Sequence, residues 1–224
     1  MSTINLGSFG NPLVGESFSL PETFERAAGF LLLVAAAPVI ATSAMAVAAL
    51  SGRSPFIAHL RVAKDGKPFW MLKLRTMWPV EGEAGGSHEW IEHIVADPED
   101  TGPEDSGKNP SDPRVSSWFA SFCRRHSIDE LPQLWHVARG EMSLVGPRPL
   151  TRAEIDRYYT ENAFELLSVK PGLTGLWQIY GRSAIRFPRR AAMDLELVRS
   201  LTARTYLKIL ARTIPAIIRG SGAW

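Results

Sequence analysis

Residues 124–150 read RRHSIDELPQLWHVARGEMSLVGPRPL, a run that combines adjacent acids with arginines and turn residues. Asp129 and Glu130 follow a pair of arginines, and Arg148 stands in a Gly-Pro-Arg-Pro turn. Carboxylates can supply a nucleophile or bind a metal ion. Guanidinium groups bind phosphate, often through two hydrogen bonds. The stretch therefore indicates chemistry on a phosphate.

The same residues also fit a purely structural interpretation. Ser127 and Glu130 have the spacing of a capping box, in which each side chain satisfies the backbone amide of the other and a helix begins. Pro132 would then lie in the first turn, where its missing N–H is tolerated. The two interpretations are compatible, because a helix N-terminus keeps a carboxylate ionised and attracts phosphate. A short helix over 131–139, ended by Gly140, is predicted to follow.

Charge is unevenly distributed along the 224 residues, although the net charge is only +2. Residues 79–107 hold nine of the 23 acids and no Lys or Arg, so the rest of the chain is basic. A basic body suits an anionic membrane surface and anionic substrates. We find no recognised nucleic-acid motif and therefore expect no nucleic-acid partner. The single cysteine, Cys123, excludes an internal disulfide and is expected in the core.

The chain starts with residues rich in Gly, Ser, Asn and Pro, and an apolar segment, residues 27–50, follows. Residues 1–21 are expected to be flexible, without the basic region of a cleaved signal peptide. No charge occurs between Arg26 and Arg53, so a helix over 22–52 is long enough to cross a bilayer. Pro38 near its middle equally permits a re-entrant helix that breaks and returns to the side it entered. Basic residues after the segment predict that residues 53–224, the rest of the chain, are cytoplasmic.

The remaining pattern predicts an α+β, mostly helical domain. Asp65-Gly66 predicts a hairpin between strands 57–62 and 68–74. Lys73 and Arg75 would share one face of the second strand, either towards a site or towards solvent. Residues 79–111 are expected to be an acidic insertion or lid, with a short helical piece at 89–95. Further helices are predicted at 115–125, 152–169 and 189–219, the last with a kink at Pro215 and an apolar stripe typical of a membrane interface.

The chain resembles the bacterial sugar transferase family, the monotopic polyprenyl-phosphate phosphoglycosyl transferases. The resemblance covers roughly residues 24–224, in the right order. It rests on several runs: Ser127–Val137, Gly140–Pro149, Arg61-Val62 with Lys67-Pro68-Phe69, Lys73–Met77, Asp112–Val115 and Lys170–Gln178. The small size is similar to that of the exopolysaccharide-type members, which move glucose or galactose phosphate.

This resemblance implies a fold, a reaction and a location. It implies a membrane-associated domain with a re-entrant helix broken at Pro38, a small hairpin and amphipathic interface helices. The substrates would be a UDP-sugar and undecaprenyl phosphate, the cofactor Mg²⁺, and the place the cytoplasmic face of the bacterial inner membrane.

The resemblance also implies roles for individual residues. Asp129 would be the nucleophile that carries the sugar phosphate, and Glu130 would bind Mg²⁺ with it or transfer a proton. The expected substrate-binding residues are Lys73, Arg75, Arg114, Arg124, Arg148 and Gln178. Asp194 matches a family aspartate, for which a structural role is the simpler interpretation. Two other hypotheses stay open: a membrane-anchored, non-catalytic adaptor, and a Mg²⁺-dependent phosphohydrolase that uses the same two acids.

Overall fold

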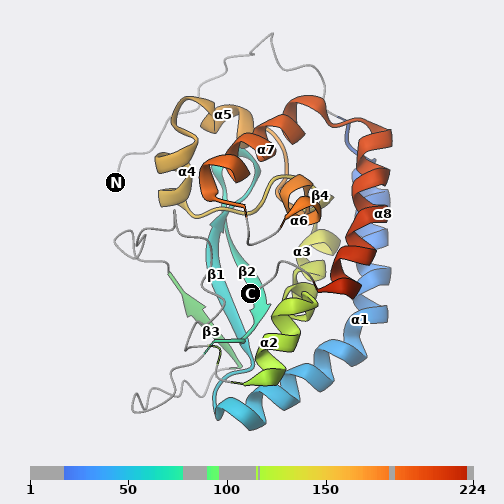
Figure 1. The fold of residues 1–224 in the computed structure, drawn as a ribbon, viewed down its shortest axis with the longest axis vertical. Helices are drawn as coiled ribbons and strands as arrows, with labels where there is room; N and C mark the ends of the chain where they lie inside the picture. The colour runs from blue at the N-terminus through green and yellow to red at the C-terminus, as the bar shows by residue number, and fades with distance from the viewer. Residues whose placement is uncertain (1–17, 78–89, 96–114, 116, 182–184, 221–224) are drawn as a thin grey trace.

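The fold was analysed in a computed structural model that describes residues 18–77, 90–95, 115, 117–181 and 185–220 (Figure 1). It confirms the predicted α+β, mostly helical class. The helices are α1 (Glu22–Ser51), α2 (Trp118–Arg125), α3 (Leu134–Arg139), α4 (Arg152–Tyr158), α5 (Ala163–Leu166), α6 (Leu176–Tyr180), α7 (Phe187–Ser200) and α8 (Ala203–Arg219). The strands are β1 (Phe56–Val62), β2 (Pro68–Leu74), β3 (Ile91–Ile94), β4 (Ser143–Val145) and β5 (Gly172–Thr174), and 3₁₀ turns cover Lys64–Gly66, Ile128–Gln133 and Thr160–Asn162.

Helix α1 carries the apolar segment and changes direction about halfway along its length (Figure 1). The helix is continuous through Pro38, so the predicted break takes the form of a bend. Proline removes one helical N–H and crowds the preceding turn, which is a common cause of such bends. The hydroxyl of Thr42 donates to the carbonyls of Pro38, at 2.8 Å, and Val39, at 3.2 Å. Such bonding of a threonine hydroxyl to the preceding turn often bends a helix, whereas the carbonyl that Pro38 deprives of its helical N–H is that of Val34.

Most of the apolar surface of α1 is exposed. An 18-residue window has a mean hydropathy of 2.3, and only 17% of it is buried within the protein. By length and composition, α1 is therefore the one helix among the described residues that is able to cross a membrane.

The first turns of α1 are fixed to the rest of the domain by Glu25. This carboxylate is buried, and one of its oxygens accepts hydrogen bonds from Ser143 Oγ, from the backbone N–H of Leu144 at 3.0 Å, and from Tyr206 Oη at 2.5 Å. These donors belong to β4 and α8. Burying a carboxylate is unfavourable unless it is hydrogen-bonded, so this cluster ties three segments together.

Strands β1 and β2 form the predicted antiparallel hairpin, and their register pairs Ile57 with Lys73. Asp65 (φ 59°) and Gly66 (φ 74°) make its turn in the left-handed region, as the Asp-Gly signal predicts. The predicted helix near 89–95 is wrong. Residues Ile91–Ile94 form β3, which pairs in parallel with β1, because the exposed edge of β1 offers backbone partners. The rest of the acidic insertion, 79–89 and 96–111, lies outside the described residues.

A second, two-stranded parallel sheet joins two segments that are far apart in sequence. Strand β4 pairs with β5, and Gly146 N–H donates to Thr174 O at 3.0 Å. In return Gly172 N–H donates to Pro147 O at 2.8 Å. The backbones approach so closely that a Cβ on Gly172 would lie 2.0 Å from the nitrogen of Gly146. This sheet therefore brings the Gly-Pro-Arg-Pro turn next to the Pro171-Gly172 loop.

Two of the predicted long helices are interrupted. Region 152–169 contains α4 and α5, which are separated by a 3₁₀ turn. Region 189–219 contains most of α7 and the whole of α8, which are separated at Leu201-Thr202. Thr202 is extended, and its hydroxyl accepts from the N–H of Thr205, so a new helix begins there. Pro215 lies inside α8. From the predicted apolar stripe of α8, Leu207, Ile214 and Ile218 are exposed, as an interface helix requires.

The core holds His136, which connects β2 to α3. Its Nε2 accepts a hydrogen bond from the N–H of Leu72 at 3.0 Å, and its Nδ1 lies 2.6 Å from Glu141 Oε2. Nε2 must therefore be unprotonated, with the proton on Nδ1. Burial lowers the pKa of His136, although the hydrogen bond and charge of Glu141 act in the opposite direction.

Replacing His136 with alanine is expected to destabilise the fold by about 1–3 kcal/mol at pH 8, because a buried N–H and a carboxylate lose their partner. The lowered pKa also predicts a pH effect. The unfolded chain, with a histidine pKa near 6.5, takes up the proton first as the pH falls, so this contribution is complete above that value and is lost below it. Thermal unfolding at pH 8 and pH 5.5 checks both effects. The variant should lose less stability on acidification than the parent, and equal losses would contradict this role of His136.

Candidate active site

Asp129 and Glu130 lie in the 3₁₀ turn Ile128–Gln133, between α2 and α3. The predicted capping box does not form. Ser127 has φ 55°, its side chain makes no cap hydrogen bond, and the turn is instead closed by Glu130 N–H donating to Ser127 O at 3.1 Å. A six-residue 3₁₀ turn does not provide the field of a long helix, so the argument from a helix N-terminus does not apply to Asp129.

The carboxylate of Glu130 forms an ion pair with Lys73. Lys73 Nζ lies 3.0 Å from Glu130 Oε1, and both side chains are largely shielded from solvent. Lys73 comes from β2, which packs against the 3₁₀ turn. Lys73 therefore forms an ion pair with Glu130 and does not lie on a solvated strand face.

The side chain of Asp129 is only 8% exposed. Its charge acts on Cys123, which is buried in α2 as expected of a core cysteine. Burial first, and the negative charge of Asp129 second, raise the pKa of the Cys123 thiol to about 11. The thiol therefore stays protonated at neutral pH and is a poor nucleophile beside the carboxylate.

The turn that contains Arg148 is fixed on both sides. Val62 N–H donates to Leu150 O at 2.9 Å, which joins the end of β1 to this turn, and β5 holds its other side. The prolines on both sides of Arg148 restrict its backbone. The guanidinium carbon lies 5.4 Å from the centre of the Trp177 ring, within the range of a cation–π contact.

A small hollow brings four of the predicted site residues together. Its lining combines the charged and polar side chains with apolar ones: Lys73, Glu130, Arg148, Gln178, Met71, Gln133, Pro149, Gly172 and Leu173. The Oε1 atom of Gln178 is buried there without a hydrogen-bond partner in the described part of the chain. The structure thus places an acid, a lysine, an arginine and an amide around one opening. Asp129 is not among its lining residues and adjoins it only as the chain neighbour of Glu130.

Positive charge gathers on the face of the hairpin that carries Lys73. His59 lies opposite Met71 in the register and therefore on that face. Its pKa is lowered to about 4, mainly by burial and then by nearby cations, which are Arg61, Lys73, Arg148 and Arg75. Three of these cations are paired with carboxylates, Arg61 with Glu154, Lys73 with Glu130 and Arg75 with Glu92, which leaves Arg148 as the cation of this group without a carboxylate ion pair among the described residues.

The other predicted arginines are placed differently. Arg75 is buried, and its guanidinium binds Glu92 of β3 and the carbonyl of Ser54, so the structure gives it a role in holding the sheet together. Arg124 lies at the end of α2, and its buried Nε has no hydrogen-bond partner among the described residues. Arg114 lies outside the described residues.

Asp194 is buried in α7 and accepts a hydrogen bond from Tyr159 Oη at 3.0 Å. Burial raises the pKa of this carboxyl to about 7, against the hydrogen bonds from Tyr159 and the backbone of Arg148 and against the charges of Arg148 and Arg190. Asp194 therefore lies behind Arg148, which agrees with the structural role that the sequence favours.

Sequence reasoning missed Trp177 as a site residue. It is buried under Arg148, and its position next to Gln178 was the one signal that pointed to it. The contact itself joins residues that are far apart in sequence, so no local pattern predicts it.

The donor set fits Mg²⁺ only together with a substrate. Within the described residues, no group of three His, Cys, Asp or Glu side chains gathers that is able to hold a metal alone. Asp129 and Glu130 offer two adjacent carboxylates. Mg²⁺ commonly binds through one or two carboxylates and the phosphates of the substrate, so these residues fit the ion.

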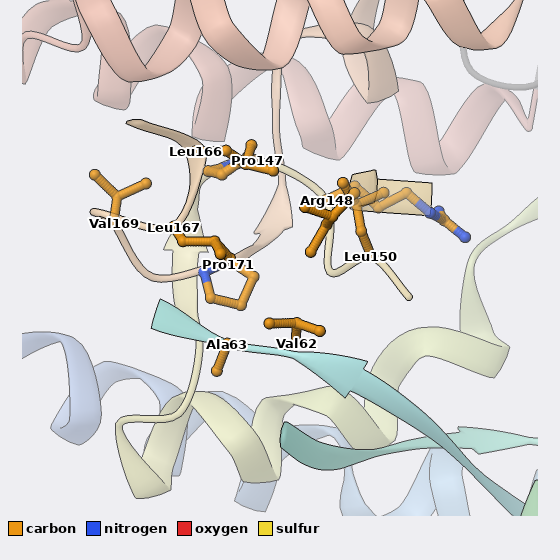
Figure 2. Close-up of a pocket in the computed structure, with 10 residues that line it drawn as sticks. Val62, Ala63, Pro147, Arg148, Leu150, Leu166, Leu167, Val169 and Pro171 are labelled. Carbon is orange, nitrogen blue, oxygen red and sulfur yellow. The ribbon is translucent and has the colours of Figure 1, made fainter. Parts of the chain in front are cut away.

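A second hollow lies beside the first and is almost entirely apolar. Figure 2 shows it between the end of β1 and the segments that carry Pro147, Leu166 and Pro171, with the guanidinium of Arg148 pointing away from it. Arg148 is the one charged residue of its lining, and its guanidinium points out of this hollow. We therefore place the chemistry in the hollow that contains Lys73 and Glu130.

Comparison with known proteins agrees with this geometry. A family model described as "Bacterial sugar transferase" matches residues 17–220. The exopolysaccharide production protein ExoY of Sinorhizobium fredii is 36% identical over 202 residues, which are 90% of this chain and 87% of that protein. A UDP-galactose-lipid carrier transferase of Erwinia amylovora is 38% identical over 175 residues, which are 77% of this chain but only 35% of the relative. The chain thus spans about a third of that relative's length.

A third relative is named for a full reaction. The UDP-glucose:undecaprenyl-phosphate glucose-1-phosphate transferase of Caulobacter vibrioides is 32% identical over an alignment of 224 positions, gaps included, that covers 96% of this chain and 76% of that protein.

Proposed function

The chain belongs to the bacterial sugar transferase family, and on that premise we propose that it transfers a hexose 1-phosphate from a UDP-hexose to undecaprenyl phosphate and releases UMP. The observation that supports the proposal is the hollow in which Glu130, Lys73 and Arg148 meet, with the buried Asp129 directly before Glu130 in the chain. Relatives named for UDP-galactose and UDP-glucose support a hexose donor, and glucose and galactose are the two candidates. The reaction would begin the assembly of an exopolysaccharide or another glycoconjugate.

In the first step, a carboxylate oxygen of Asp129 attacks the phosphorus atom that bears the sugar. A bond forms between this oxygen and phosphorus, the bond from phosphorus to the UMP oxygen breaks, and UMP leaves as the anion. In the second step, an oxygen of undecaprenyl phosphate attacks the same phosphorus and releases the Asp129 carboxylate. The covalent intermediate divides one displacement into two.

The surrounding cations make this attack feasible. A carboxylate and a diphosphate repel each other, so positive charge has to be supplied at the phosphate oxygens. Lys73 and Arg148 are placed to do so, and Gln178 offers an amide to the substrate. Asp129 and Glu130 are the residues that would hold Mg²⁺, which when bound neutralises charge on the phosphate oxygens.

The two acids point in different directions. The Glu130 carboxylate lies 3.0 Å from Lys73 Nζ, and residues adjacent in a 3₁₀ turn point about 120° apart. Both acids therefore cannot face one phosphorus atom equally. We assign attack to Asp129 and metal binding or proton transfer to Glu130.

An assay with purified protein tests the proposed function. Radiolabelled UDP-glucose and UDP-galactose are offered separately, with undecaprenyl phosphate and Mg²⁺, and UMP and labelled lipid are measured. We expect turnover only with both substrates present, loss of turnover with a chelator, and recovery with added Mg²⁺. Turnover without the lipid would indicate a phosphohydrolase, and absence of turnover with every UDP-sugar would favour an adaptor.

For the membrane topology we propose that α1 enters the cytoplasmic face of the inner membrane, bends at Pro38 and returns to the same face. Support comes from the bend, the Thr42 hydroxyl bonds and the exposed apolar surface. The exposed Leu207, Ile214 and Ile218 of α8 suit the adjoining interface.

Single cysteines check this topology in a Cys123→Ser background. In intact cells, cysteines introduced by Thr3→Cys and Lys64→Cys should both resist a membrane-impermeant maleimide and should both react after the inner membrane is opened. Labelling of the Thr3→Cys protein alone in intact cells would contradict the re-entrant form and indicate a spanning helix.

A further inference from the structure

The buried indole of Trp177 has two guanidinium groups over it. The guanidinium carbon of Arg148 lies 5.4 Å from the ring centroid, and that of Arg190 lies 4.8 Å from it. Arg148 comes from the turn after β4, Trp177 from α6 and Arg190 from α7. Trp177 is 5% exposed, so water is largely excluded from this contact. Cation–π contacts are strongest when they are desolvated.

Arg190 is itself fixed in place. Its Nε donates to the carbonyl of Ile185 at 2.6 Å, just before α7 begins. Arg190 does not line the hollow that contains Lys73 and Glu130, whereas Arg148 does. The two arginines therefore differ. Both contact the Trp177 ring, but Arg148 also lines the hollow and Arg190 does not.

The side chain of Arg148 needs such support. Its backbone is restrained by the flanking prolines and by the pairing of Val62 with Leu150. No carboxylate among the described residues forms an ion pair with its guanidinium, so the Trp177 ring is the contact that fixes the direction of this long side chain. An unrestrained arginine would lose much side-chain entropy on binding phosphate.

Two like charges on one ring repel each other, and a buried acid offsets this. Asp194 is 1% exposed, and the positive charges of both arginines stabilise its ionised form against the dominant effect of burial. Tyr159 holds Asp194 by a hydrogen bond of 3.0 Å. The two arginines, the indole and the acid thus form one packed unit behind the hollow.

We propose that Arg190 is a positioning residue: it fixes the Trp177 ring, and the ring fixes the Arg148 guanidinium at the hollow where the sugar phosphate is transferred. This inference rests on the proposed function. Arg190 acts through Arg148 and does not touch the substrate.

A double-mutant cycle in the transferase assay tests the inference. Arg190→Gln is expected to lower kcat/KM about 2- to 30-fold, the range of one cation–π contact. In the Arg148→Gln background, the same change should have an effect of less than about twofold, because contacts in one chain of interactions are not additive. Arg189→Gln is the matched control, since this neighbouring arginine is exposed on α7 and should leave activity at the parental level.

Variants of the ring provide a second readout. Trp177→Phe retains an aromatic face and should keep more activity than Trp177→Leu, and Arg190→Gln should have little further effect in the Trp177→Leu background. If Arg190 had a structural role only, Arg190→Gln would lower the melting temperature, and its effect on activity would not depend on an aromatic ring at position 177. If Arg190→Gln fails to fold, Arg190→Met, which keeps an apolar stem of similar length and removes the charge, takes its place in both cycles.

The outcomes separate this inference from the proposed function. Parental activity of Arg148→Gln would overturn the role of Arg148 and, with it, the inference. If Arg148→Gln is impaired but Arg190→Gln has the same effect in both backgrounds, or no effect in either, the inference alone is wrong and the transferase proposal stands.

Discussion

The Asp129→Asn variant is expected to lose formation of lipid-linked sugar by a factor on the order of 10³ or more, because removal of a nucleophile takes away the covalent route entirely. Asparagine has nearly the same shape, and Asp129 lies in a turn whose backbone bond, from Glu130 N–H to Ser127 O, does not involve its side chain. The fold should therefore persist. The measurement is radiolabelled lipid product per unit time, together with the melting temperature of the same preparation.

The covalent step has its own readout. With UDP-sugar labelled in the β-phosphate and no lipid present, the parent should retain label on the protein after denaturation, and Asp129→Asn should retain none. Asp156→Asn is the matched control: it changes an exposed aspartate of α4 that pairs with Arg152, and it should behave as the parent. Lipid-linked sugar at the parental rate in Asp129→Asn would remove the basis of the mechanism.

The second large effect is expected for Gly172→Ala, which should destabilise the protein by about 3 kcal/mol or more. The added Cβ would lie 2.0 Å from the nitrogen and 2.6 Å from the Cα of Gly146, and both are backbone atoms. No flexible side chain is able to move aside, so the two segments have to separate. Separation breaks the hydrogen bond from Gly172 to Pro147 and releases the turn that carries Arg148.

Thermal unfolding in detergent measures the change, and for a domain of this size about 2–4 °C accompanies each kcal/mol. Gly181→Ala provides the comparison, because its Cβ would meet only side-chain atoms of Ile185, which are able to shift. Activity should fall further in Gly172→Ala than loss of folded protein explains, since Arg148 is displaced. Unchanged melting temperature and activity would show that the close backbone approach does not constrain the site.

The site was predictable where local chemistry and spacing carry the signal. For Lys73 the pattern left a solvated strand face open, and only the family resemblance implied a site role; the structure brings it to one hollow with Glu130 and Arg148. Asp129, Glu130 and Arg148 were selected from the sequence pattern itself. The Asp-Gly turn of the hairpin also followed from local rules. These residues are recognisable because their function depends on charge and turn geometry, which the sequence displays directly.

Two of the errors have one physical cause, which is competition from distant partners, and the third has a local cause. Ser127 and Glu130 have capping-box spacing, but Glu130 binds Lys73 instead. Residues 91–94 resemble a helical piece, but they pair with β1, and Glu92 meets Arg75. In the last helical region, the cap formed by Thr202 outweighs the continuous apolar pattern.

The hydrogen bonds of Glu25 have a consequence for engineering of this protein. A chimera in which another apolar helix replaces α1 would place no carboxylate beside Ser143, Leu144 and Tyr206. The Leu144 N–H and the Tyr206 hydroxyl would lose their acceptor, while Ser143 would keep only the carbonyl of Val145. Even a graft with ideal hydrophobicity should therefore yield an unstable catalytic domain. In this chain the apolar helix is an internal part of the folded domain and not an interchangeable anchor.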